Sequence, residues 1–132
     1  MVLKNLLGIE DALILEAAEI EMTTLRSEQP LPQGRFDANH YRGIHRHLFQ
    51  DVYQWAGEYR TVRIAKGDSI FCYPENIPSQ MQRLFGSIDG GIRFLNRAPE
   101  EFAAELARFL AELNAIHPFR EGNGRAQLSC VD

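Results

Sequence analysis

A nonapeptide near the end of the sequence gathers most of the residues that could do chemistry. It runs from His117 to Arg125 and reads HPFREGNGR. His117 is the side chain of this stretch that can accept a proton near neutral pH. Two glycines flank Asn123 and permit backbone conformations that aim consecutive N–H groups into one concavity. Such a concavity at the start of a helix favours an anion, and phosphate is its natural occupant.

Two charged side chains of the same stretch extend the phosphate hypothesis. Arg125 offers a planar fork of donors to a further phosphate oxygen. Glu121 is a hard oxygen ligand, and phosphate-bound Mg²⁺ typically takes only one or two protein carboxylates. Each residue taken singly is more often a helix end, a turn or a solvated charge, so the hypothesis depends on the joint pattern. That pattern predicts a magnesium–nucleotide site with His117 as the base beside it.

Hydrophobic periodicity predicts a mainly helical domain around this stretch. Apolar residues recur at helical spacing over residues 9–26, from Asp37 to near Gly57, over 76–95 and over 99–116, and a last helix begins at Arg125. The first helix should bury one apolar face and leave its glutamates in solvent. That face consists of Leu13, Ala17, Ile20 and Leu25. The expected buried stripe of helix 99–116 consists of Phe102, Leu106, Phe109 and Leu113.

One segment between the helices changes to strand-like composition. β-Branched and aromatic residues fill 59–65 and 70–73, and the turn residues Lys66-Gly67-Asp68-Ser69 separate the two runs. This pattern predicts a small β-hairpin. Because a lone hairpin is only marginally stable in water, we expect it to lean on the helices. The predicted fold class is therefore mainly α with one small β-hairpin.

Length and composition limit the class of protein. The chain has 132 residues, a net charge of −4 and 45% hydrophobic residues, which predicts one globular domain over residues 1–132. The mild acidic balance argues against nucleic-acid binding, and no apolar run predicts a membrane helix or a secretory signal. Cys72 and Cys130 lack metal-site spacing, so a reducing, cytoplasmic location is expected. His40, His45 and His47 are predicted to be structural or surface residues, because residues two apart on a helix point in different directions.

The nonapeptide resembles the signature of the Fic (filamentation induced by cyclic AMP) family, H-x-F-x-[DE]-G-N-G-R-x-x-R. The resemblance extends upstream through residues 44–49, 51–57 and 60–64 and covers nearly the whole chain. It implies the Fic fold, a helical bundle whose hairpin, called the flap, lies beside the active-site loop. It also implies transfer of AMP from Mg-ATP to a Tyr, Ser or Thr hydroxyl of a target protein. Because Fic domains usually continue with more helices, it implies a single domain truncated shortly after the motif.

The resemblance assigns a role to each matching position. His117 would be the catalytic base that deprotonates the target hydroxyl, and Phe119 would anchor the loop in the core. Glu121 would hold Mg²⁺. The related Doc branch, which phosphorylates its targets, has lysine at the second glycine of the loop, so Gly124 favours adenylyl transfer. The cradle for the phosphates would consist of Gly122, Asn123, Gly124 and Arg125.

The flap is the expected docking site for the target. In the family it binds an extended stretch of the target by strand addition, which gives register with little demand on sequence. Lys66 and Asp68 would select targets by charge, and Ile70 or Phe71 would clamp the modified side chain. A solvated turn with one buried aromatic is an equally good interpretation. The matching residues are Lys66, Gly67, Asp68, Ser69, Ile70 and Phe71.

One position departs from the family signature, whose final arginine is Leu128 here. The change implies weaker binding of the γ-phosphate. The inhibitory motif [ST]-x-x-x-E-[GN] is absent, because Gln29 follows Thr24 and Glu28, so a separate small antitoxin chain would supply any inhibition. A bacterial toxin and a secreted effector delivered into a host cytosol both fit the resemblance. Two alternatives stay open: transfer of another nucleotide or phosphocholine, and a catalytically silent nucleotide-binding module.

Overall fold

The structure is a computed structural model that describes residues 2–131, with the side chains of 2–130. The described residues form five α-helices, two 3₁₀ helices and one antiparallel pair of strands. This confirms the expected fold class, although the predicted domain ends, Met1 and Asp132, lie outside the described residues. In chain order the elements are α1 (Ala12–Ser27), α2 (Ala38–Phe49), β1 (Ala65–Lys66), β2 (Ser69–Ile70), η1 (Pro74–Asn76), α3 (Ile77–Ile88), η2 (Asp89–Phe94), α4 (Pro99–Ile116) and α5 (Asn123–Val131).

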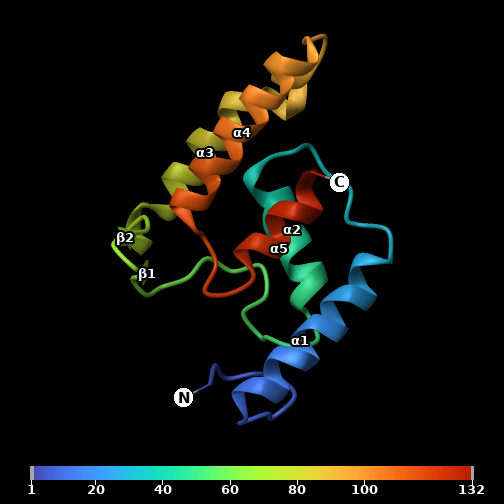
Figure 1. The fold of residues 1–132 in the computed structure, drawn as a ribbon, viewed down its shortest axis with the longest axis vertical. Coiled ribbons are helices and arrows are strands. Elements are labelled where there is room, and N and C mark those ends of the chain that lie inside the picture. The colour runs from blue at the N-terminus through green and yellow to red at the C-terminus, as the bar shows by residue number, and fades with distance from the viewer. Residues whose placement is uncertain (1, 132) are drawn as a thin grey trace.

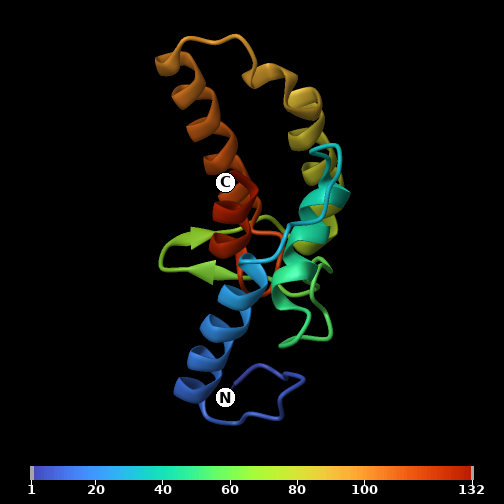
Figure 2. The ribbon, with the colours of Figure 1, turned by 90° about the vertical axis from the view of Figure 1, so that its right-hand side faces the viewer.

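Helices α2 and α5 lie at the centre of the molecule, and the other elements extend from them. In Figure 1, α3 and α4 form an antiparallel arm on one side of this centre, and α1 lies on the other side. The hairpin projects sideways at the level of the loop between α4 and α5 (Figure 2). One buried cluster joins α2, α3, α4 and α5 around Phe119, and a second joins α1 and α2. Both clusters meet beneath the nonapeptide, which is thereby built on a packed core. Within the described residues, no helix combines the length and the apolar character that a bilayer crossing needs.

Two helix starts follow directly from the sequence. Asp37 precedes α2, and its side chain accepts a hydrogen bond from the N–H of His40 at 2.7 Å. This is an N-cap, which satisfies one of the free amides of the first turn. Pro99 occupies the first turn of α4, where its missing N–H costs nothing. Both predicted starts are confirmed.

Helix α1 buries a different face from the predicted one. It buries Leu15 and Thr23 instead. Leu13 is 78% exposed and Leu25 is 54% exposed, so the prediction was wrong. All four residues of the predicted face are exposed: Leu13, Ala17, Ile20 and Leu25.

Apolar packing and two polar pairs hold α1 in this orientation. Leu15 and Met22 pack in the cluster that α1 shares with α2. Arg26 makes a salt bridge of 2.7 Å with Asp51, and the hydroxyl of Tyr53 donates to Glu19 at 2.6 Å. Both pairs connect α1 to the turns that follow α2. Periodicity counts charged side chains as solvent-facing, so it could not find a face that is held partly by ion pairs and hydrogen bonds.

The helix predicted from Asp37 to near Gly57 ends earlier, at Phe49. Two successive amides, those of Val52 and Tyr53, both donate to the carbonyl of Phe49 at 3.0 Å, which closes a turn. These two residues stay buried, so the helical spacing of apolar residues continues through segments that are not helix.

The segment predicted as one helix over 76–95 is also broken. Helix α3 ends at Ile88, and Gly90 and Gly91 have φ of 65° and 94°, a left-handed conformation that a helix cannot contain. At the tip of the same arm Phe102 is 42% exposed, in contrast to the predicted stripe, whereas Phe109 and Leu113 are buried as expected.

The hairpin is present but shorter than predicted. Ala65 pairs with Ile70 and Lys66 with Ser69, and each strand has two residues. The remaining residues of the predicted strands are not strand, and two of their amides, those of Arg60 and Cys72, donate to carbonyls at the end of α4 and just after it. Helix α5 begins at Asn123, two residues before the predicted start.

Candidate active site

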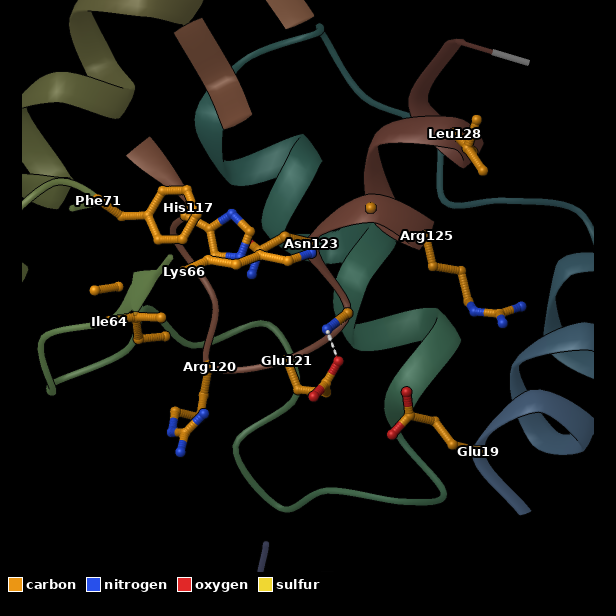
Figure 3. Close-up of a pocket in the computed structure, with 13 residues that line it drawn as sticks. Glu19, Ile64, Lys66, Phe71, His117, Arg120, Glu121, Asn123, Arg125 and Leu128 are labelled. Atoms are coloured by element: carbon orange, nitrogen blue, oxygen red, sulfur yellow. Dashed lines mark hydrogen bonds between the residues drawn. The ribbon is translucent and has the colours of Figure 1, made fainter. Parts of the chain in front are cut away.

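The nonapeptide links the end of α4 to the first turn of α5. His117 follows the last residue of α4 and adopts a left-handed conformation with φ 50° and ψ 64°. Its N–H still donates to the carbonyl of Leu113 at 3.0 Å, whereas Pro118 disfavours continued helix at the residue before it. The left-handed turn directs the imidazole of His117 into a pocket (Figure 3).

Phe119 is the anchor of the loop. Its side chain is fully buried, and its ring stacks on His45 at 3.8 Å between centroids and on Tyr41 at 5.7 Å. Asn123 closes the loop around it: the N–H of Phe119 donates to Oδ1 at 3.0 Å, and Nδ2 donates to the carbonyl of Phe119 at 2.7 Å. The side chain of Asn123 therefore holds the loop, and its contribution to a phosphate cradle is its backbone N–H.

His45 supports the same loop from within the core. Its Nε2–H donates to the carbonyl of Glu121 at 2.9 Å, and its Nδ1 accepts from the N–H of Gly57 at 2.9 Å. These two bonds define a neutral tautomer with the proton on Nε2. Burial lowers the pKa of His45 to about 4, so the ring is neutral at pH 7.

The two glycines of the loop are needed for different reasons. Gly122 has φ of +83°, and a Cβ there would lie 2.2 Å from the ring of Phe49. Backbone conformation and packing therefore both require glycine. Gly124 lies in the first turn of α5, and a Cβ there would meet nothing within 4 Å, because the position faces open space.

A pocket of about 630 Å³ opens above the loop. Figure 3 shows that the motif loop, the flap and α1 each contribute side chains to it. The flap residues Gly67, Asp68, Ser69 and Ile70 lie outside its lining, and Phe119 lies in the core beneath it. The predicted site residues that the structure brings together in the lining are Lys66, Phe71, His117, Glu121, Gly122, Asn123, Gly124 and Arg125.

His117 is oriented from two sides. The ring of Phe71 stacks on it with centroids 3.9 Å apart and an interplanar angle of 8°. Its Nδ1–H donates to the carbonyl of Asn114 at 3.3 Å, which leaves Nε2 as the acceptor. Burial lowers the pKa of His117, and the nearby charges of Arg60 and Lys66 lower it further. The imidazole is therefore a neutral base at pH 7.

The sequence analysis missed several residues of the pocket. Glu19 reaches it from α1, where the hydroxyl of Tyr53 holds its carboxylate. Burial raises the pKa of Glu19, the hydrogen bond from Tyr53 opposes this, and the charge of Glu121 adds to it. Ile64 and Arg120 also line the pocket. Arg120 and Ile64 lie within the nonapeptide and the segment 60–64, but the sequence analysis gave them no role, and no pattern marked Glu19.

The donor groups of the pocket fit a magnesium nucleotide. The first-turn amides of α5 have no partner within the helix, and the residues that carry them line the pocket, where an anion can reach them. The carboxylate of Glu121 is exposed beside them and accepts a hydrogen bond from the N–H of Gly122 at 3.1 Å. The described residues contain no cluster of three His, Cys, Asp or Glu that could hold a metal alone. Mg²⁺ would therefore be held jointly by Glu121 and the phosphates.

The sequence of this chain matches a known protein family. The family model described as Fic/DOC family matches residues 35–132. The chain belongs to the Fic/DOC family. The chain is 48% identical over 128 residues to the probable protein adenylyltransferase y4lH of Sinorhizobium fredii, covering 96% of this chain and 67% of that protein. It is 39% identical over 127 residues to the protein adenylyltransferase VbhT of Bartonella schoenbuchensis, covering 94% of this chain and 27% of VbhT.

A solved structure shows the same arrangement. The BepC protein of Bartonella tribocorum, a VirB-translocated effector with bound AMPPNP, matches the Fic domain with a TM-score of 0.85 at 26% identity. The match covers 98% of this chain and 70% of the BepC chain. The family, the fold and the enzyme class expected from the sequence, a nucleotidyltransferase for protein adenylylation, are confirmed for the domain. The chain spans about two thirds of the length of y4lH and about a quarter of VbhT.

Proposed function

We propose that this protein transfers AMP from Mg-ATP to a Tyr, Ser or Thr hydroxyl of a target protein. The observation that carries the proposal is the position of His117, whose neutral, oriented imidazole lines the same pocket as the first turn of α5. A proton acceptor and a phosphate cradle that share one pocket can activate a hydroxyl beside a bound nucleotide. The names of y4lH and VbhT, and the AMPPNP in BepC, support this assignment.

In the proposed reaction the target oxygen attacks the α-phosphorus of ATP. A bond forms between that oxygen and the α-phosphorus, the bond to the β-phosphate oxygen breaks, and pyrophosphate leaves. Nε2 of His117 accepts the proton of the hydroxyl, and Arg125 and the α5 amides stabilise the negative charge that develops. Mg²⁺, held through Glu121, supplies further neutralisation of the phosphates when it is bound.

The flap supplies the proposed docking edge for the target. Its four strand residues are exposed, so their unpaired backbone groups are accessible for strand addition. Phe71 is occupied by its stack on His117, whereas Ile70 is 70% exposed and is the proposed clamp for the modified side chain. Lys66 lines the pocket, and Asp68 lies at the turn.

Two cellular roles are proposed for the protein. The protein acts on a target in the cytosol of its own bacterium as a toxin, or in a host cytosol as an effector. The description of BepC as a VirB-translocated effector supports the second form. Control by a small antitoxin chain stays a prediction.

The test is His117→Ala, assayed with ATP labelled at the α-phosphate and a lysate that contains candidate targets. A general base contributes about 10²–10⁴-fold, so labelling should fall at least about 100-fold. The thermal shift caused by Mg-ATP should be unchanged, since the cradle is intact. His47→Ala, outside the pocket, is the control for loss of an imidazole, and its stability is measured as well because Nε2–H of His47 donates to the carbonyl of Arg26 at 2.8 Å.

Three outcomes would contradict the proposal. Label transferred only from the γ-phosphate would indicate phosphorylation. A larger thermal shift with another nucleotide would indicate a different donor, because the preferred ligand stabilises most. Stabilisation by Mg-ATP without any transfer by the wild-type protein would indicate a silent nucleotide-binding module.

A further inference from the structure

Arg60 is a buried charged residue that the mechanism above does not use. It lies between α2 and β1, and only 4% of its surface is exposed. Its guanidinium donates to four backbone carbonyls. Nε donates to His117 at 2.7 Å, Nη1 donates to Val62 at 2.7 Å, and Nη2 donates to Ile116 at 3.0 Å and to Cys72.

No carboxylate accompanies this buried charge. Arg60 is absent from the salt bridges of the described residues, which involve Arg26, Arg97 and Arg108. A buried cation without hydrogen-bond partners is costly, so its partners here are informative. Two of them, the carbonyls of Ile116 and His117, lie at the C-terminal end of α4, where the helix dipole favours a positive charge.

The four carbonyls belong to three separate segments. Ile116 and His117 end α4, Val62 belongs to the chain that enters the flap, and Cys72 belongs to the chain that leaves it. Two backbone hydrogen bonds join the same segments that the guanidinium joins. The N–H of Arg60 donates to Pro118 at 2.8 Å, and the N–H of Cys72 donates to Ala115 at 3.2 Å.

This arrangement fixes the segments on both sides of the flap, at Val62 and at Cys72, to the end of α4. Cys72 directly follows Phe71, whose ring stacks on the imidazole of His117. A displacement of the guanidinium would therefore move the stacking ring, the docking edge and the base relative to one another. The planar fork of arginine reaches several acceptors in fixed directions, which a lysine ammonium on a flexible stem does not.

We infer that Arg60 is a positioning residue that sets the distance between the flap and His117. It thereby determines whether a hydroxyl docked on the flap meets the base. The inference rests on the proposed function for its kinetic consequence, because that function makes the flap the docking edge. The structural tether itself does not depend on which group is transferred.

The first test measures the tether without any transfer assay. In Arg60→Lys, amide hydrogen exchange at Cys72 should become at least about 10-fold faster, while amides of α2 near Leu48 keep their wild-type exchange. Arg63→Lys is the matched control, because Arg63 is an exposed arginine of the same segment that lies over the ring of Tyr73 at 4.3 Å. Unchanged exchange at Cys72, or an equal increase throughout the core, would overturn the inference.

The second test is kinetic and uses the same two variants with a target and Mg-ATP. Arg60→Lys should raise the KM for the target and lower kcat, with kcat/KM reduced at least about 30-fold, and leave the thermal shift by Mg-ATP unchanged. Full activity in Arg60→Lys would show that charge alone suffices and would overturn the positioning role. A loss of the Mg-ATP shift together with activity would show general destabilisation and would also overturn it.

A third measurement needs only the wild-type protein, and it tests the tether between the flap and α4 even if the variants do not fold. The amides of Arg60 and Cys72 should exchange through one common opening, with the same dependence on denaturant. Independent openings would overturn the tether. Faster exchange in Arg60→Lys combined with no AMP transfer by the wild type would refute the proposed function and leave the tether standing.

Discussion

The loop between His117 and Asn123 and the flap face the same pocket but are built in opposite ways. In the loop, Pro118, Phe119 and Asn123 are buried, and the carbonyl of Glu121 is held by a histidine from the core. In the flap, all four strand residues are exposed, and each strand has only two residues. Figure 2 shows the hairpin projecting away from the helices that enclose the loop.

Under the proposed function, this difference separates chemistry from recognition. The loop would hold a base and a phosphate cradle in fixed geometry before substrates arrive, and buried contacts supply that rigidity. The flap would accept a partner strand, which requires an open backbone edge. The flap is fixed where its chain enters and leaves it, by Arg60, by the amide of Cys72 and by the stack of Phe71 on His117, and its strands stay exposed. Disturbing each region should therefore have distinct consequences.

The largest effect is expected from Gly122→Ala in the loop. The new Cβ would meet the ring of Phe49 at 2.2 Å, and φ of +83° is strained for alanine. Overpacking and left-handed strain together should reduce the free energy of unfolding by about 4 kcal/mol. Urea denaturation measures this loss. Gly124→Ala is the matched control, because its Cβ meets open space, and it should unfold like the wild type. Equal stability of the two variants would contradict the comparison.

The next largest effect is a loss of stability in acid, caused by protonation of His45 beneath the loop. Its pKa in the folded state, about 4, lies below the value near 6.5 of the unfolded chain. The unfolded state therefore binds the proton first, and stability is lost as the pH falls from about 6.5 to about 4. The full loss is about 3 kcal/mol.

Urea denaturation at several pH values between 7.5 and 4.5 checks this. His45→Gln removes the titrating group, so the variant should be less stable at pH 7.5 but show a flatter dependence on pH. Identical pH slopes in the variant and the wild type would show that His45 does not control acid unfolding. Two-dimensional NMR of the ring should show it neutral at pH 6.

The smallest effect on stability is expected from Ile70→Ala in the flap. The side chain is 70% exposed, so unfolding should change by less than about 0.5 kcal/mol. If Ile70 contacts the target, its KM should rise about 5- to 10-fold with kcat nearly unchanged. Steady-state transfer to a target measures the KM of this variant, and urea denaturation measures its free energy of unfolding. A large loss of stability with unchanged KM would reverse the assignment of the two regions.

The helices were predictable where apolar spacing and caps agree, as at Asp37 and Pro99. Prediction failed where another interaction decided the outcome. The orientation of α1 depends on the contacts of Arg26 and Glu19 with the turns after α2, and spacing within α1 contains no information about those partners. The end of α2 at Phe49 was missed because buried residues continue with helical spacing through the following turns.

The site shows the same division. The motif residues that line the pocket were predicted because they are contiguous, from His117 to Arg125. Glu19 was missed because it comes from a distant segment and carries no local signal. Arg60 lies in the segment 60–64 that carries the resemblance, but nothing in that segment shows which carbonyls its guanidinium reaches. The sequence also left open whether Phe71 is exposed or buried. The structure shows that its ring is buried and stacks on the imidazole of His117.

The sequence by itself determined the family, the mainly helical class and which residues form the loop from His117 to Arg125, because those depend on residue types at short, fixed spacing. The tertiary structure alone decided which face of α1 is buried, how His45 holds the loop and how Arg60 joins the flap to the end of α4. These features depend on contacts between residues that are far apart in the chain. Their energies come from burial and hydrogen-bond partners that form only when the helices pack.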